Sequence, residues 1–121
     1  MIDFKSLIKG TPLLPILQPQ SVEQAVKIAG AVHASGLRSI EVVRRTPVAA
    51  DAVAAIREAF PELLVGMGTV LNQDHVQEAV DAGSQFIITP TISEKLLSAL
   101  SDITIPYLPG TASPSDILLA V

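Results

Sequence analysis

The chain repeats one pattern: a short apolar run, a turn with a helix-capping residue, an amphipathic helix and often a glycine before the next apolar run. Equivalent positions in the first four apolar runs, Pro15, Ile40, Val65 and Ile88, recur at nearly equal intervals. Each interval is the length of one strand and one helix. The repetition predicts an α/β protein whose parallel strands are covered by helices.

The strands are predicted in the apolar runs 13–17, 39–43, 63–67, 86–88 and 105–108. Four residues after these runs can cap a helix with a side-chain oxygen, Ser21, Thr46, Asn72 and Ser113, and the helix after the fourth run is expected from about residue 93 to residue 100. Glycines at 36 and 83 are placed to end the first and third of these helices. Because proline cannot donate to a ladder, we expect Pro106 at the margin of the fifth strand.

Two architectures are compatible with this repetition. A (β/α)8 TIM barrel needs about 250 residues, or about 200 at the low end, and this chain has 121. Residues 1–121 are expected to form a single domain, and five βα units would make it the N-terminal part of a TIM barrel, about five eighths of one. A doubly wound open sheet of five strands is the alternative that length alone favours. The last predicted helix still has its apolar face running at Val121, which favours a partial chain.

Composition excludes several classes of partner. The net charge is −4 and no lysine or arginine stripe is present, so nucleic acid is not an expected partner. No apolar stretch reaches the roughly 20 residues of a membrane-spanning helix. The start of the chain lacks signal-peptide organisation and cysteine is absent, which together favour the cytoplasm. His33 and His75 have no second ligand at a suitable spacing, so we expect surface histidines and no metal site.

Glu41 is the polar residue that demands an explanation, because it interrupts an apolar strand. A carboxylate buried there without a partner would cost several kcal/mol. It forms either a structural ion pair with Arg44 or Arg45, or part of a functional site at the carboxyl end of the strand. Strand alternation places Glu41 and Arg45 on one side and Arg44 on the other, so Arg45 is the expected companion.

Small residues end the next strands. Gly68 and Thr69 follow the third strand, where a glycine allows close approach and a threonine hydroxyl can bind a carboxylate; ordinary turn glycines are the alternative. The spacing is not that of a nucleotide-binding loop. Pro90 ends the fourth strand and is expected to line the same site, although ordinary turn chemistry also explains it. Four lysines, Lys5, Lys9, Lys27 and Lys95, lie outside the predicted strands and are expected to be solvated.

Four segments carry a family resemblance. They read IEVVRRT (40–46), GMGTVL (66–71), FIITP (86–90) and IPYLPGT (105–111). Together and in this order they resemble the 2-keto-3-deoxy-6-phosphogluconate (KDPG) / 4-hydroxy-2-oxoglutarate (KHG) aldolase family, from residue 12 to residue 116. The resemblance implies a TIM-barrel, usually homotrimeric lyase of carbohydrate metabolism and the Entner–Doudoroff pathway. Its reaction gives pyruvate and glyceraldehyde 3-phosphate, or pyruvate and glyoxylate, with no metal or organic cofactor.

The resemblance also implies roles for individual residues. Glu41 matches the general acid/base, Arg45 the residue that grips the pyruvate carboxylate, and Thr69 a second contact to the same pyruvyl unit; Pro90 is expected to contact the substrate. Arg44 departs from the pattern, because the family often has an apolar residue there.

The Schiff-base lysine of the family lies on strand six, about a dozen residues beyond Val121, and no lysine of this chain is placed to replace it. The 121 residues alone are therefore predicted to be inactive. The alternative is a non-catalytic half-barrel that binds a small keto acid or assembles with a complementing chain.

Overall fold

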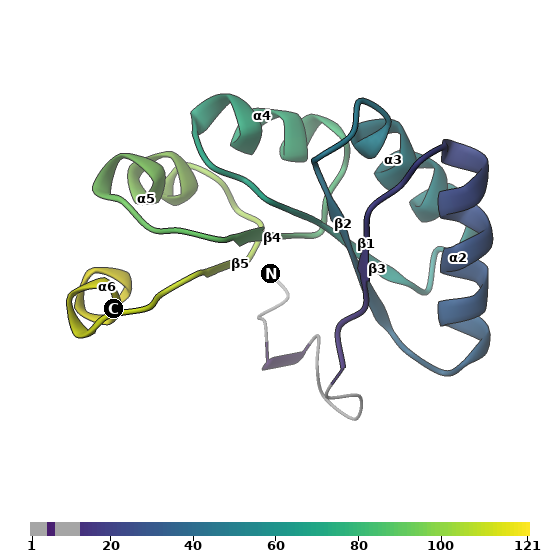
Figure 1. Cartoon of the computed structure of the whole chain (residues 1–121), viewed down its shortest axis with the longest axis horizontal. Helices are drawn as coiled ribbons and strands as arrows, with labels where there is room; N and C mark the ends of the chain where they lie inside the picture. The colour runs from purple at the N-terminus through teal and green to yellow at the C-terminus, as the bar shows by residue number, and fades with distance from the viewer. Residues whose placement is uncertain (1–4, 7–12) are drawn as a thin grey trace.

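A computed structural model describes residues 5–6 and 13–121, in which strands and helices alternate (Figure 1). The strands are β1 (Ile16–Leu17), β2 (Ser39–Val43), β3 (Leu64–Gly68), β4 (Phe86–Thr89) and β5 (Tyr107–Pro109). The helices are α2 (Val22–Ala34), α3 (Ala49–Ala59), α4 (Gln73–Asp81), α5 (Glu94–Ser101) and α6 (Pro114–Ala120). All five predicted βα units are therefore present.

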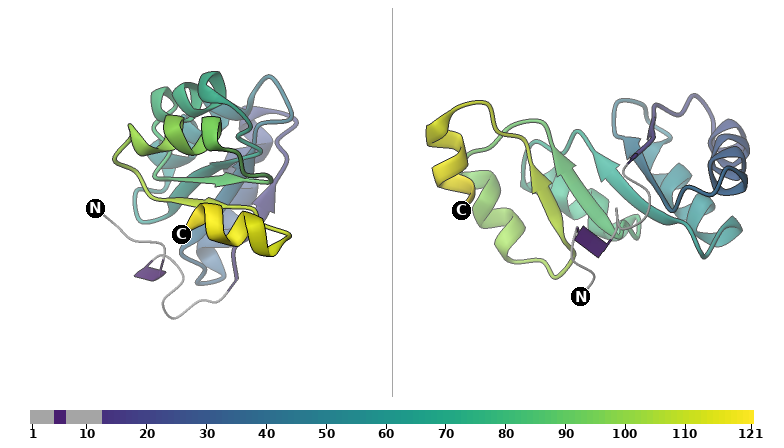
Figure 2. Two further views of the ribbon diagram at one scale, coloured as in Figure 1. Left: turned by 90° about the vertical axis from the view of Figure 1, so that its left-hand side faces the viewer. Right: turned by 90° about the horizontal axis from the view of Figure 1, so that it is seen from below.

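The five strands form one parallel sheet in the order β1-β2-β3-β4-β5, which is also their order in the sequence. A doubly wound sheet reverses direction at a switch point and carries helices on both faces. Here every crossover continues in the same direction, and the helices follow one another in an arc on one side of the sheet (Figure 1). Figure 2 shows α6 at the opposite end of this arc from α2. The doubly wound alternative is wrong, and the sheet curves as part of a barrel does.

The register confirms part of the predicted spacing. Ile40 pairs with Val65, the equivalent position in the next repeat, as expected. Between β3 and β4 the offset is shorter, because Gly66 pairs with Phe86, so the predicted equivalence of Val65 and Ile88 is wrong. The third unit is shorter because α4 has 9 residues, against 13 in α2 and 11 in α3.

The two faces of the sheet have different surroundings. Side chains on the outer face pack under the helices and are fully buried: Ile40, Val42, Val65, Met67 and Ile87. Each such side chain contributes about 1.5–3 kcal/mol of hydrophobic stabilisation. Alternation turns Glu41, Gly66 and Phe86 to the inner, concave face. Phe86 is fully buried but lies outside the core cluster under the helices.

Three of the four predicted helix caps are confirmed, and Ser93 at the start of the fourth predicted helix is a further cap. The side-chain oxygens of Ser21, Asn72, Ser93 and Ser113 each accept a hydrogen bond from a backbone N–H three residues later. The prediction for Thr46 is wrong, since α3 starts at Ala49 after Val48, without a side-chain cap. Instead the Thr46 hydroxyl donates to the carbonyl of Pro19 at 2.7 Å. This bond ties the loop after β2 to the loop after β1.

The position of Pro106 and the lengths of the helices were also predicted from the sequence. Pro106 directly precedes β5, and its carbonyl accepts from the N–H of Ile87 at 3.0 Å, so proline sits at the strand margin as predicted. Within residues 5–6 and 13–121, no helix is long and apolar enough to cross a membrane.

Candidate active site

A pocket of about 300 Å³ lies at the carboxyl ends of β2, β3 and β4. It brings together the four residues that the sequence predicts at the site: Glu41, Arg45, Thr69 and Pro90. Ile16, Gln18, Val43 and Ile88 complete its lining. The pocket therefore forms where parallel strands deliver their C-terminal side chains, as in other α/β sites.

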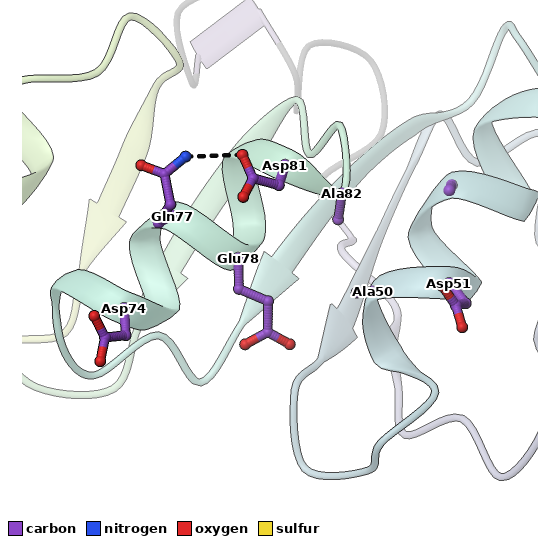
Figure 3. A pocket seen from close by; sticks show the side chains of 8 residues that line it. Ala50, Asp51, Asp74, Gln77, Glu78, Asp81 and Ala82 are labelled. Carbon is purple, nitrogen blue, oxygen red and sulfur yellow. Dashed lines mark hydrogen bonds between the residues drawn. The ribbon is translucent and has the colours of Figure 1, made fainter.

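A larger hollow of about 530 Å³ lies elsewhere, between α3 and α4 (Figure 3). Its lining consists of alanines and of the polar side chains of Asp51, Asp74, Gln77, Glu78 and Asp81. None of the predicted site residues reaches it. We place the candidate active site at the smaller pocket because chemistry depends on which groups converge, and size does not decide that.

Glu41 provides the titratable group of the pocket. Its side chain stands on the inner face of β2 and only 6% of its surface is exposed. Burial raises the pKa of its carboxyl above the ordinary value, and the positive charge of Arg45 offsets part of that rise. A carboxyl whose pKa is raised toward neutral pH is suited to both accepting and donating a proton.

The space for this carboxylate comes from Gly68 on the neighbouring strand. A Cβ at position 68 would lie 1.8 Å from Oε1 of Glu41, far inside contact distance. Gly66 leaves space in the same way for the ring of Phe86, which would lie 2.2 Å from a Cβ there. Both glycines thus allow a close approach, and the groups that approach them are the side chains of Glu41 and Phe86 on the inner face.

Arg45 and Arg44 point to opposite sides of the sheet, as alternation predicts. The N–H of Arg44 donates to the carbonyl of Gly68 at 3.0 Å, which extends the β2–β3 ladder by one residue. Arg45 then lines the pocket, while Nε of Arg44 binds Oε2 of Glu78 at 2.8 Å on the helix side. The predicted alternative of an ion pair between Glu41 and an arginine does not form among the described residues.

Thr69 has an unusual backbone. Its φ of 63° is the single positive value at a non-glycine position among the described residues. A β-branched residue in this left-handed region costs of order 1–3 kcal/mol, and such strain concentrates at functional sites. The next residue, Val70, is fully buried, and its N–H donates to the carbonyl of Ile88 at 3.4 Å, so the chain is held in place directly after Thr69. The loop after β3 therefore presents the threonine side chain to the pocket at a conformational cost.

The sequence interpretation missed Gln18. This exposed amide follows β1 directly and lines the pocket with the predicted residues. The rule that polar residues at strand ends form sites would have found it, had it been applied to the first strand. By contrast, Pro109–Thr111 at the end of β5 do not line this pocket.

The remaining candidate groups lie away from the pocket. Lys5, Lys27 and Lys95 are exposed, as predicted for solvated lysines, whereas Lys9 lies outside the described residues. His33 is exposed as expected, whereas His75 is half-buried and contacts Arg44, so it is a surface residue only in part. In the described part of the chain, no group of three or more histidine or acidic side chains is arranged to hold a metal ion.

Comparisons with known proteins show which family the chain belongs to. The sequence model of the family "KDPG and KHG aldolase" matches residues 4–121. The chain is 40% identical to the KHG/KDPG aldolase of Escherichia coli (strain K12) over 117 residues, which covers 97% of this chain and 55% of that protein. Among solved structures, KDPG aldolase from Zymomonas mobilis ATCC 29191 superimposes with a TM-score of 0.92 at 34% identity over 98% of this chain and 57% of its own.

A second solved structure is the KDPG aldolase from Legionella pneumophila, with pyruvate captured at low pH as a covalent carbinolamine intermediate. It has a TM-score of 0.89 and 34% identity, and it covers 94% of this chain and 55% of that one. The chain thus spans about half the length of the relatives that it matches. The family model and the curated relatives lead to one assignment: the chain belongs to the KDPG and KHG aldolase family.

Proposed function

We propose that this chain supplies the pyruvyl-binding and proton-transfer part of a class I aldolase. Its substrate is 2-keto-3-deoxy-6-phosphogluconate, which is cleaved to pyruvate and glyceraldehyde 3-phosphate; 4-hydroxy-2-oxoglutarate, which gives pyruvate and glyoxylate, is a second substrate. The observation that carries the proposal is the convergence of Glu41, Arg45 and Thr69 on one pocket.

Arg45 binds the substrate carboxylate in this proposal. It has no ion-paired carboxylate among the described residues, so its guanidinium is available to a ligand. A planar guanidinium can donate two parallel hydrogen bonds to the two oxygens of a carboxylate. The hydroxyl of Thr69 adds a second contact to the same pyruvyl unit, and Pro90 forms part of the wall beside it.

Glu41 moves the proton in the cleavage step. With C2 of the substrate held as an iminium, the ionised carboxylate removes the proton of the C4 hydroxyl. The C3–C4 bond breaks, the C4 oxygen becomes the aldehyde carbonyl of the first product, and the bonding electrons pass into the iminium to give an enamine. Glu41 then returns its proton to C3, and hydrolysis of the imine releases pyruvate.

The lysine that forms the iminium is proposed to come from polypeptide outside these 121 residues. Lys5, Lys27 and Lys95 do not line the pocket. The relatives are nearly twice as long as this chain, and the Legionella enzyme of the same family holds pyruvate as a carbinolamine. The resemblance further leads us to propose a cytoplasmic homotrimer that uses no metal or organic cofactor.

Borohydride trapping tests the proposal. Purified protein is incubated with pyruvate and sodium borohydride, and its mass is compared with the 12.7 kDa of the chain alone. A mass well above that value with a reduced pyruvyl adduct on a lysine beyond Val121 supports the aldolase. The mass of the chain alone with no adduct, together with pyruvate binding in a titration, supports the rival half-barrel that binds a keto acid without turnover.

A further inference from the structure

Arg44 connects the end of β2 to α4. Its Nε donates to Oε2 of Glu78 at 2.8 Å, and its Nη1 lies 2.9 Å from Nε2 of His75. Its side chain is 24% exposed, so both contacts are partly shielded from water. Since Arg45 is the next residue, these contacts fix the backbone from which the pocket arginine extends.

His75 continues the connection to the loop after β3. Its ring Nδ1 accepts from the backbone N–H of Leu71 at 3.1 Å, and its backbone N–H donates to Oδ1 of Asn72 at 3.0 Å. Leu71 is two residues beyond Thr69, the residue with the strained backbone. One set of side chains therefore touches both loops that deliver ligand-binding groups to the pocket.

We infer that Arg44, His75 and Glu78 form a positioning cluster that fixes the spacing between Arg45 and Thr69 and thereby sets the affinity for the carboxylate of the keto acid. The inference rests on the proposed function for its ligand. The cluster lies on the helix side of the sheet and does not line the pocket. These three residues are positioning residues and do not touch the substrate.

The protonation state of His75 controls the cluster. Three donors face the ring: the N–H of Leu71 at Nδ1, and the guanidinium of Arg44 and the side-chain amide of Asn72 at Nε2. A neutral imidazole offers one acceptor nitrogen, and an imidazolium offers none. Protonation therefore removes the one acceptor that the neutral ring offers, which binds the N–H of Leu71 in the tautomer whose Nδ1 carries no hydrogen, and places a positive charge beside Arg44.

The charged surroundings of His75 come from several elements. Burial and then Arg44 lower the pKa of His75, while Glu78 and Asp74 on its own helix raise it. Asp51 of α3 stands across the hollow into which Glu78 extends (Figure 3). Lys95 of α5 lines a shallow depression with Asn72 and Asp74.

Arg44→Leu in the intact enzyme that contains this chain tests the inference. We expect KM for the keto acid substrate to rise by about 10-fold while kcat changes by less than about 2-fold, because Glu41 stays on its buried strand. Arg44→Lys keeps the positive charge but has one donor nitrogen in place of two, and is expected to recover part of the loss. The matched control is Arg57→Leu, which removes an arginine that binds the carbonyl of Gly83 at 2.8 Å, far from the pocket loops.

A pH series separates positioning from simple stabilisation. Wild-type KM is expected to rise as the pH falls through the lowered pKa of His75, and this rise is expected to begin at higher pH in Arg44→Leu because one cause of the lowering is gone. Unchanged KM and an unchanged pH profile in Arg44→Leu would overturn the inference.

Backbone amide shifts of Thr69 and Leu71 in the same variant report on the loop without any substrate. If the wild-type protein fails to cleave the substrates, the proposed function is wrong, and these amide shifts still decide whether the cluster positions the loop. Shifts in Arg44→Leu that are absent from Arg57→Leu support the cluster, and equal spectra overturn it.

Discussion

Oε1 of Glu41 lies where a side chain at position 68 would begin, 1.8 Å from the Cβ that Gly68 lacks. The two residues belong to neighbouring strands, and Gly68 pairs in register with Val43, two residues along β2 from Glu41. The absence of a side chain on one strand thus gives the carboxylate on the next strand its place in the pocket. This relationship leads to the first prediction.

Gly68→Ala is expected to displace the Glu41 carboxylate and slow turnover of the intact enzyme by about 100-fold. Because the end of a glutamate side chain can rotate away, the free energy of unfolding should fall by less than about 1 kcal/mol. Gly66→Ala is the comparison, since its Cβ would meet the buried ring of Phe86 at 2.2 Å. That variant should lose about 1–3 kcal/mol in urea unfolding. Equal turnover in wild type and Gly68→Ala would contradict the explanation.

Glu41→Gln keeps the shape of the side chain and removes its proton chemistry. We expect imine formation to survive in borohydride trapping while turnover slows by roughly 100-fold or more. Turnover at the wild-type rate in this variant would remove Glu41 from the mechanism.

The same substitution should change the dependence of stability on pH. The pKa of Glu41 is raised in the folded state above 4.5, so its carboxyl contributes stability below that pH that is lost as the pH rises through the folded-state pKa. Glu41→Gln does not titrate. The variant should therefore be more stable than wild type at neutral pH, with the difference shrinking in acid, as measured by urea midpoints. A constant difference at all pH values would contradict the raised pKa.

Thr69→Gly relieves the positive φ of 63° and removes the hydroxyl. Relief of about 1–2 kcal/mol of strain outweighs the extra backbone entropy of glycine, about 0.5–1 kcal/mol, so the free energy of unfolding should rise slightly. Binding of pyruvate, measured by titration of the intact enzyme, should weaken by about 10-fold with the loss of one hydrogen bond. Thr69→Ser is the control that keeps the hydroxyl. A Thr69→Gly protein that is clearly less stable than wild type would show that the strain is compensated locally.

His75→Gln should flatten the acid limb of the stability profile. The pKa of His75 is lowered in the folded state below 6.5, so its neutral form contributes stability that is present above 6.5 and lost as the pH falls through the folded-state pKa. Urea midpoints between about pH 7.5 and pH 5 should decline in wild type more steeply than in His75→Gln. Parallel declines would mean that His75 is not responsible.

Local signals in the sequence predicted the elements well because they act over a few residues. The cap side chains of Ser21, Asn72, Ser93 and Ser113 accept from backbone N–H groups three residues away, so both partners of each bond lie within one short stretch of sequence. Thr46 failed as a cap because its hydroxyl donates to Pro19, 27 residues away, a partner that only the folded chain supplies. The predicted equivalence of Val65 and Ile88 was wrong for a related reason, since the register between β3 and β4 depends on the length of α4 and its loops.

Period-two alternation along β2 determined from the sequence alone that Glu41 and Arg45 share a side and that Arg44 does not, because successive residues of a strand face opposite ways. Tertiary structure decided the rest. It placed Thr69 in a left-handed conformation, brought Gln18 into the pocket, and turned His75 from an expected surface residue into a partner of Arg44. These outcomes depend on distances between segments that are remote in the chain, and the packing of helices on a curved sheet sets those distances.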